Sequence, residues 1–176
     1  MSNPYSTPGQ QGPDEYREHL SADARQLQLV TSALAMSILV MMGMFLGLNE
    51  GELILEPEMM SWLAVGMAAV MTLNSFIIPS FVTQAQLKRL DPSELRAAET
   101  PDKFAMVSPT FRPGHITGCA ILEGAAVMNL VSYMITSFVG NLAAASLMLV
   151  LILFRFPTAN RISFWTQDRI RELELA

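Results

Sequence analysis

Residues 116–139 read ITGCAILEGAAVMNLVSYMITSFV, an apolar run that contains one charged residue, Glu123. A transmembrane helix needs about 20 predominantly apolar residues, so this run is long enough to cross a bilayer. Three more apolar runs occur at 27–48, 59–82 and 142–156. The last is short, but Arg155 extends it, because its stem can stay in lipid while its charged group reaches the headgroups. The sequence therefore predicts an all-α integral membrane protein, a four-helix bundle.

The basic residues predict the orientation of these helices. All 11 Lys and Arg residues lie before the first run, between the second and third runs, or from Arg155 onward. The loop 49–58 contains four glutamates and no basic residue, and the last turn is only Gly140 and Asn141. Because loops rich in Lys and Arg stay in the cytoplasm, we expect both termini to be cytoplasmic.

Five segments follow from this topology. We expect a disordered cytoplasmic tail (1–20), a first transmembrane hairpin (21–83), a cytoplasmic linker (84–113), a second transmembrane hairpin (114–157) and a cytoplasmic amphipathic helix (158–176). The tail is rich in Pro, Gly, Ser and Gln, a composition typical of disorder. The last segment places Trp165 among basic residues, which favours a helix on the membrane surface. A helix that contacts other protein is the alternative.

The two hairpins resemble copies of each other. Each ends with a proline and a hydroxyl residue, at 79–80 and at 157–158, and the sequence ALAM at 33–36 aligns with AILE at 120–123. Both hairpins start and end on the same side of the membrane. The pattern therefore predicts a tandem internal repeat about an axis along the membrane normal.

The run AILEGAA at 120–126, followed by Asn129, Tyr133 and the exit FPT at 156–158, resembles a group of small uncharacterised bacterial four-helix, double-hairpin membrane proteins. This resemblance implies a location in the bacterial inner membrane. More distantly, a double hairpin with one intramembrane glutamate is similar to the proteolipid rotor subunits of rotary ATPases. Those subunits carry the carboxylate on the returning helix of a hairpin, whereas Glu123 lies on the first helix of the second hairpin.

Glu123 is the residue of greatest functional interest. It lies about 9 residues, or roughly 14 Å, along the helix from Gly114, so it is inside the hydrocarbon layer. A carboxylate there needs a partner or a proton. Asn74 lies at a comparable distance along the second run, so we expect a neutral Glu123 bonded to Asn74. The pair either binds and releases a proton or cation, or holds two helices together.

Small residues predict where the helices pack most closely. The pairs Gly43 with Gly47 and Ala120 with Gly124 each have the small-xxx-small spacing that permits close helix approach. Asn129 is expected to form a hydrogen bond between helices.

The sequence offers no complete enzymatic, metal or cofactor signature. Met67 and Met71 have a spacing that suits Cu(I), but methionine more often fills apolar cores. His19 and His115 are too far apart to hold a haem, and no histidine was expected near a nucleophile in the same membrane layer. We therefore expect a non-enzymatic subunit without cofactor, metal or nucleic-acid partner. Its expected partners are the lipid bilayer and either further copies of the chain or other membrane subunits.

Overall fold

The computed structural model describes residues 13–50 and 53–175. Regular structure within these residues is helical, which confirms the all-α class. The helices are α1 (Pro13–Leu48), α2 (Met59–Leu87), α3 (Pro92–Ala97), α4 (Thr100–Val107), the short 3-10 helix η1 (Ser108–Thr110), α5 (Phe111–Thr136), α6 (Val139–Phe154) and α7 (Ala159–Leu175).

Three helical stretches are long and apolar enough to cross a membrane: Ser21–Leu48, Met59–Leu87 and Asp102–Thr136. Helix α6 has 16 residues, a length of about 24 Å. It meets the same test only together with α7, from which it is bent by 72°. The described chain thus has three or four helices of this kind.

One segment that we expected to be disordered is helical. Helix α1 begins at Pro13, within the predicted disordered tail, and residues 1–12 of that tail lie outside the described part. A proline in the first turn followed by Asp14 and Glu15 suits a helix N-terminus, which explains this difference. For the linker 84–113 the four prolines favour a loop with short helical pieces, and the structure has such pieces in α3, α4 and η1, of which α4 and η1 lead into α5 without a loop.

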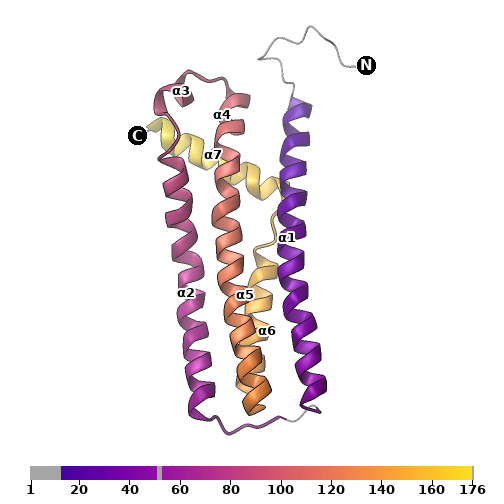
Figure 1. Cartoon of the computed structure of the whole chain (residues 1–176). Coiled ribbons are helices and arrows are strands. Elements are labelled where there is room, and N and C mark those ends of the chain that lie inside the picture. The colour runs from indigo at the N-terminus through magenta and orange to yellow at the C-terminus, as the bar shows by residue number, and fades with distance from the viewer. Residues whose placement is uncertain (1–12, 51–52, 176) are drawn as a thin grey trace.

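Helix α5 occupies the centre of the bundle. It lies between α1 and α2 and packs against α6 (Figure 1). Its fully buried residues Ala125 and Ala126 allow these neighbours to come close, and Leu122, Leu130 and the α6 residue Ile152 complete the core. Because α5 separates α1 from α2, the first predicted hairpin is open, whereas the second is packed.

Helix α7 crosses one end of the bundle (Figure 1). Its Ile162 packs with Ala24 and Leu27 of α1, and its Ile170 packs with Phe104 and Val107 of α4. The apolar face that was expected to enter the membrane surface is therefore buried against the protein. The structure shows the alternative arrangement, a helix that contacts other parts of the chain.

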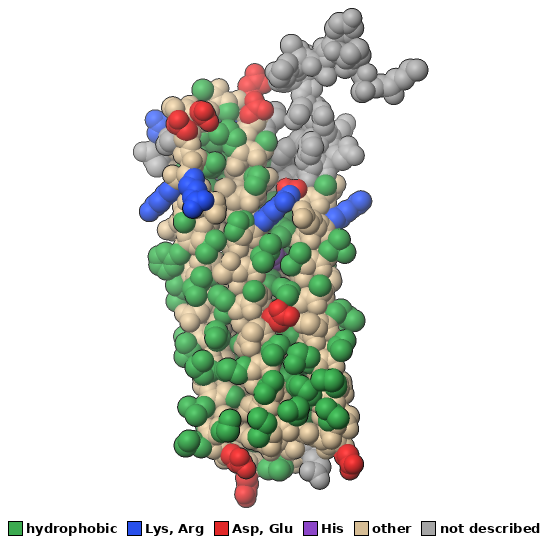
Figure 2. Space-filling view, in the orientation of Figure 1, with side chains coloured by type: hydrophobic (Ala, Val, Ile, Leu, Met, Phe, Trp, Pro, Cys, Tyr) green, Lys and Arg blue, Asp and Glu red, His purple; other side chains and the backbone are tan. Residues whose placement is uncertain are grey.

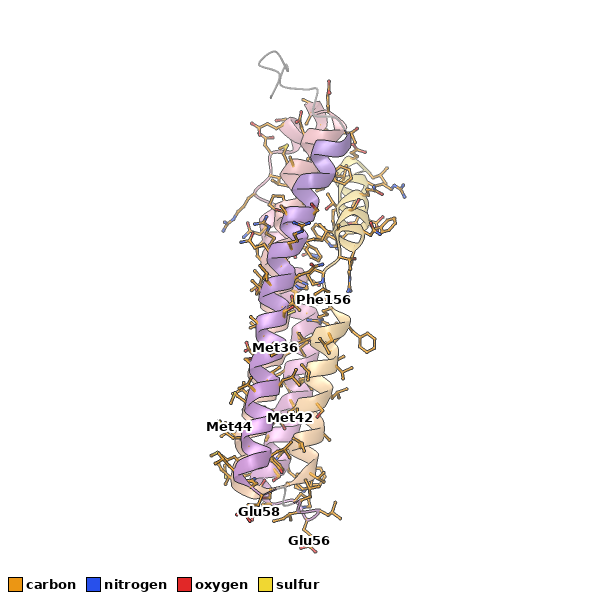
Figure 3. All side chains as sticks on the ribbon, turned by 90° about the vertical axis from the view of Figure 1, so that its right-hand side faces the viewer. Met36, Met42, Met44, Glu56, Glu58 and Phe156 are labelled. Carbon is orange, nitrogen blue, oxygen red and sulfur yellow. The ribbon has the colours of Figure 1, made fainter. Side chains whose placement is uncertain are left out.

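The outer surface is apolar between two charged ends. Hydrophobic side chains cover most of the face in Figure 2, with basic side chains gathered at the α3 and α7 end. Glu56 and Glu58 lie at the opposite end, whereas Met36 and Met44 lie along the side of α1 (Figure 3). Large exposed residues on α2 include Trp62, Leu73 and Phe81, which are 63%, 65% and 67% exposed. Helices α1 and α2 thus present wide apolar faces to the surroundings.

Candidate functional site

Glu123 is half-buried on α5 and is paired with Ser37 of α1. Its Oε1 atom is 2.5 Å from Ser37 Oγ, and the same hydroxyl is 2.8 Å from the main-chain carbonyl of Leu34. The carboxyl group therefore lies at the seam between α1 and α5, which run in the same direction through the bundle (Figure 1).

The two contacts of Ser37 depend on the protonation state of Glu123. A hydroxyl group has one proton and donates to one acceptor at a time. When Glu123 is ionised, Ser37 donates to the carboxylate and no longer to Leu34. When Glu123 is protonated, its hydroxyl donates to Ser37, and Ser37 donates to the Leu34 carbonyl. Ser37 can therefore form a hydrogen bond with the carboxyl group in either protonation state.

Asn74 is not the partner of Glu123, contrary to our expectation. A Cβ atom on Gly118 would lie 3.2 Å from the Ser75 carbonyl oxygen, and Asn129 donates to the Ala64 carbonyl at 3.3 Å. Because α2 and α5 are antiparallel, these two contacts place Glu123 at the level of about residue 70 of α2. Asn74 lies one helical turn away from that level. The prediction assumed that residues equally far from the ends of two apolar runs lie at the same level, but α2 and α5 are shifted along each other.

A second titratable group lies on the same seam. His115 Nε2 is 3.0 Å from Thr31 Oγ1 of α1 and 3.7 Å from Cys119 Sγ. Thr31 Oγ1 is also 2.8 Å from the Leu27 carbonyl, which repeats the arrangement of Ser37. Our expectation that no histidine lies near a nucleophile in the same layer is therefore wrong. The thiol of Cys119 is almost fully buried, at 1% exposure.

His115, Cys119 and Glu123 share one stripe of α5. They are spaced four residues apart, and side chains at this spacing lie on the same helix face. The α1 hydroxyls of Thr31 and Ser37 contact the first and last of them. The spacing H-x-x-x-C-x-x-x-E was visible in the sequence and could have predicted this stripe. The facing hydroxyls could not be predicted, because they require the register between α1 and α5.

Arg155, at the end of α6, contacts α2 rather than only reaching toward the membrane boundary. Its half-buried guanidinium donates to the Ser75 carbonyl at 2.9 Å and to Ser75 Oγ at 3.2 Å. It also lies over the Phe76 ring, with Cζ 4.4 Å from the ring centroid. Within the described chain Arg155 forms no ion pair. Its charge is stabilised by a carbonyl, a hydroxyl and an aromatic face.

Within the described chain, close packing occurs at other glycines than those we predicted. An added Cβ would meet no atom within 4 Å at Gly43, Gly47 or Gly124, and Ala120 is exposed. The close approaches are at Gly114, which contacts Thr83, and at Gly118, whose added Cβ would lie 3.1 Å from Pro79 Cγ. The prediction for Asn129 agrees with the structure, since this buried side chain links α5 to α2.

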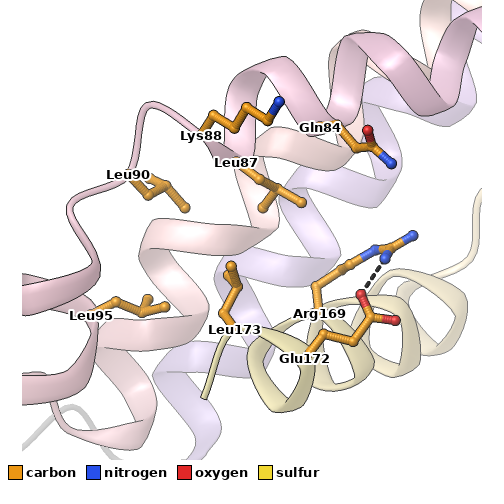
Figure 4. Close-up of a pocket in the computed structure, with 8 residues that line it drawn as sticks. All are labelled: Gln84, Leu87, Lys88, Leu90, Leu95, Arg169, Glu172 and Leu173. Atoms are coloured by element: carbon orange, nitrogen blue, oxygen red, sulfur yellow. Dashed lines mark hydrogen bonds and ion pairs between the residues drawn. The ribbon is translucent and has the colours of Figure 1, made fainter. Parts of the chain in front are cut away.

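A pocket lies near the end of α2, outside this seam (Figure 4). It has a volume of about 480 Å³ and is bounded by Leu87, Leu90, Leu95 and Leu173, with Lys88 and the ion pair of Arg169 and Glu172 at its margin. Its leucines belong to the packing between α2, α3 and α7. Among the described residues, no group of three or more His, Cys, Asp or Glu side chains is arranged to hold a metal ion.

Comparisons with known proteins give no assignment, because no family model, curated protein or solved structure matches the chain.

Proposed function

We propose that this chain is a multi-pass protein of a bacterial inner membrane, with four crossings and both termini in the cytoplasm. In this topology α6 is the fourth crossing, and α3, α4 and α7 form a cytoplasmic cap. The separation of charges supports the proposal, because the basic residues lie at the cap and Glu56 and Glu58 at the other end. The resemblance to small bacterial double-hairpin membrane proteins favours the same topology.

The topology can be tested with single cysteines. Cys119 is replaced by alanine, and one cysteine is then introduced at Leu55 in the outer loop or at Asp168 on α7. In intact cells a thiol reagent that does not cross the membrane should label the Leu55→Cys variant and leave Asp168→Cys unlabelled until the cells are opened. Labelling of Asp168→Cys in intact cells would contradict a cytoplasmic C-terminus.

The leading function is that of a non-enzymatic structural or accessory subunit of a membrane complex. The observation that carries it is the wide apolar surface of α1 and α2, on which a Cβ added at Gly43 or Gly47 would meet no atom of the described residues within 4 Å. Small residues at this spacing allow a helix of a neighbouring subunit to approach closely. The remaining surface contacts lipid.

Native mass spectrometry of the protein, gently extracted from its own membrane, tests this function. A complex with other polypeptides would support the accessory role and identify the partner. A closed assembly of this 19.4 kDa chain alone would count against that role and in favour of the second candidate.

The second candidate is proton or cation exchange by an oligomer, with Glu123 as the binding group. The contact of Glu123 with Ser37 supports it, since the seam has a hydrogen-bonding pattern for each protonation state of the carboxyl group. Glu123→Gln should preserve assembly but abolish proton exchange in proteoliposomes. If the Glu123→Gln variant fails to assemble and the wild-type protein shows no proton flux, Glu123 has a packing role.

A further inference from the structure

We propose that His115 is the group through which protons from the cytoplasmic side reach Glu123 along the seam between α1 and α5. This inference rests on the second candidate function, in which Glu123 exchanges a proton. It adds the direction of access and a second titratable residue that participates in the exchange.

The first step of the argument is access. His115 lines an open cavity of about 180 Å³ at the junction of α2, α5 and α7. Ser80, Thr83, Gln84 and Arg169 also line this cavity, which lies next to the large pocket at the end of α2 and shares Gln84 and Arg169 with it. Apolar residues, among them Leu87 and Trp165, complete the lining, but the cavity is open and several hydrogen-bonding groups face it, so water can enter. Protons can therefore reach the imidazole from the capped end of the bundle.

The second step is the position of the imidazole between the cavity and the seam. Its Nε2 atom faces Thr31 and Cys119, whereas Nδ1 has no hydrogen-bond partner in the described part of the chain. A neutral imidazole has one N–H and one free lone pair, so it can accept a proton at one nitrogen and release one from the other. Phe111 stacks on the ring, with centroids 5.5 Å apart, and restricts its orientation.

The third step is the distance to Glu123. Eight residues of α5 separate His115 from Glu123, which is about 12 Å along the helix axis, with Cys119 half-way. The hydroxyls of Thr31 and Ser37 stand at the two ends of this interval. Each hydroxyl can turn between a main-chain carbonyl of α1 and the titratable group on α5. Cys119 and Leu122, within this interval, are buried, so the proposed transfer requires water that enters the seam when α1 and α5 separate briefly.

The proton balance is simple. A proton from cytoplasmic water binds Nδ1, and the imidazolium releases the proton on Nε2 into the seam. The Glu123 carboxylate takes it up and becomes a neutral acid, while the imidazole is neutral before and after the transfer. Arg155 and Arg161 are charged groups whose field reaches His115, Arg169 of α7 lines the same cavity, and Cys119 is the titratable neighbour on its own helix. The α1 side faces it with the uncharged Thr31.

The test follows Glu123 protonation by time-resolved infrared spectroscopy after a pH jump, on the full chain in vesicles. The variant is His115→Gln, and His19→Gln, at the only other histidine, is the matched control. We expect His115→Gln to slow protonation of Glu123 by at least about tenfold while the equilibrium titration of Glu123 is retained. Imidazole added to the buffer should restore much of the rate. Thr31→Val, which removes only the hydroxyl contact, should also slow protonation.

The outcomes separate this inference from the function on which it rests. Unchanged rates in both His115→Gln and Thr31→Val would overturn the role of His115 while leaving Glu123 as an exchanging group. Absence of any Glu123 titration in the wild-type protein would overturn the second candidate function and the relay together. A slow rate in His115→Gln that imidazole does not restore would also contradict the relay, because a purely structural role predicts it.

Discussion

The guanidinium of Arg155 donates to the carbonyl of Ser75, the one carbonyl of α2 that Pro79 deprives of its helical partner. Within an α-helix each carbonyl accepts from the N–H four residues later, and proline has no N–H. A backbone carbonyl without a partner in apolar surroundings is costly, so this carbonyl must be satisfied by another donor. Arg155 supplies that donor from the end of α6 and thereby joins α6 to α2.

Arg155→Met should destabilise the protein, because it removes this donor but retains an apolar side chain. Hydrogen bonds to charged groups contribute about 1.5 to 3 kcal/mol, and we expect the free energy of unfolding to fall by about 2 kcal/mol. Denaturant unfolding in one detergent measures the difference. Arg155→Lys, which keeps the charge and one donor, should lose less. Equal stability of Arg155→Met and the wild type would contradict this account.

Pro79→Ala should reduce the dependence on Arg155, because alanine restores an N–H to the carbonyl of Ser75. In that background Arg155→Met is expected to cost less than in the wild type, with a coupling of about 1 kcal/mol between the two sites. The double-mutant cycle of unfolding free energies measures this coupling. Strictly additive effects would show that the proline and the arginine act independently.

The glycines should differ sharply in their tolerance of alanine. A Cβ on Gly118 would lie 2.5 Å from Arg155 Nη1 and 3.2 Å from the Ser75 carbonyl oxygen, so Gly118→Ala should disturb the same contact. We expect a loss of about 1 to 3 kcal/mol in unfolding free energy. Gly43→Ala, where nothing lies within 4 Å, is the matched control and should be neutral within the monomer. If Gly43→Ala weakens only a larger assembly, the exposed face of α1 is a subunit contact.

The predicted apolar runs agree with the long helices because hydrophobic length is a local property of the sequence. Glu123 and Asn129 were also recognisable, since a polar residue in an apolar run must be satisfied by a partner. The partners themselves depend on how far each helix is shifted along its neighbour, and single runs contain no such information. The sequence therefore predicts Asn74 as the partner of Glu123, whereas the structure has Ser37.

The same limit applies to the glycines and to the open first hairpin. Spacing identified Gly43, Gly47 and Gly124 as small, but not which helix face would be covered. The glycines at close helix contacts, Gly114 and Gly118, lie where α5 passes Pro79 of α2. That juxtaposition joins segments far apart in the sequence, so only the assembled bundle reveals it.

Ile162 should hold α7 on the end of the bundle. Its side chain is 2% exposed and packs with Ala24 and Leu27 of α1. Ile162→Ala should weaken this contact by about 2 kcal/mol or more, so that α7 opens more often. Limited trypsin digestion should then cleave faster at Arg161 and Arg169. Phe164→Ala, at a side chain that is 67% exposed, should leave the cleavage rate unchanged, and faster cleavage of both variants would argue against a docked helix.

The start of α3 should respond to pH through Asp91. Its side chain accepts hydrogen bonds from the Ser93 hydroxyl at 2.6 Å and the Ser93 N–H at 2.8 Å, and these bonds lower the pKa of the carboxyl group. Because the folded pKa is lowered, the stabilisation is present above the ordinary carboxyl range and is lost as the pH falls through the lowered value. Hydrogen exchange at the Ser93 amide should therefore lose protection in acid. Amide exchange itself depends on pH. Asp91→Asn keeps a capping oxygen but does not titrate, so its exchange profile is the control for this dependence. Parallel profiles for the two proteins would show that the carboxylate does not stabilise this helix.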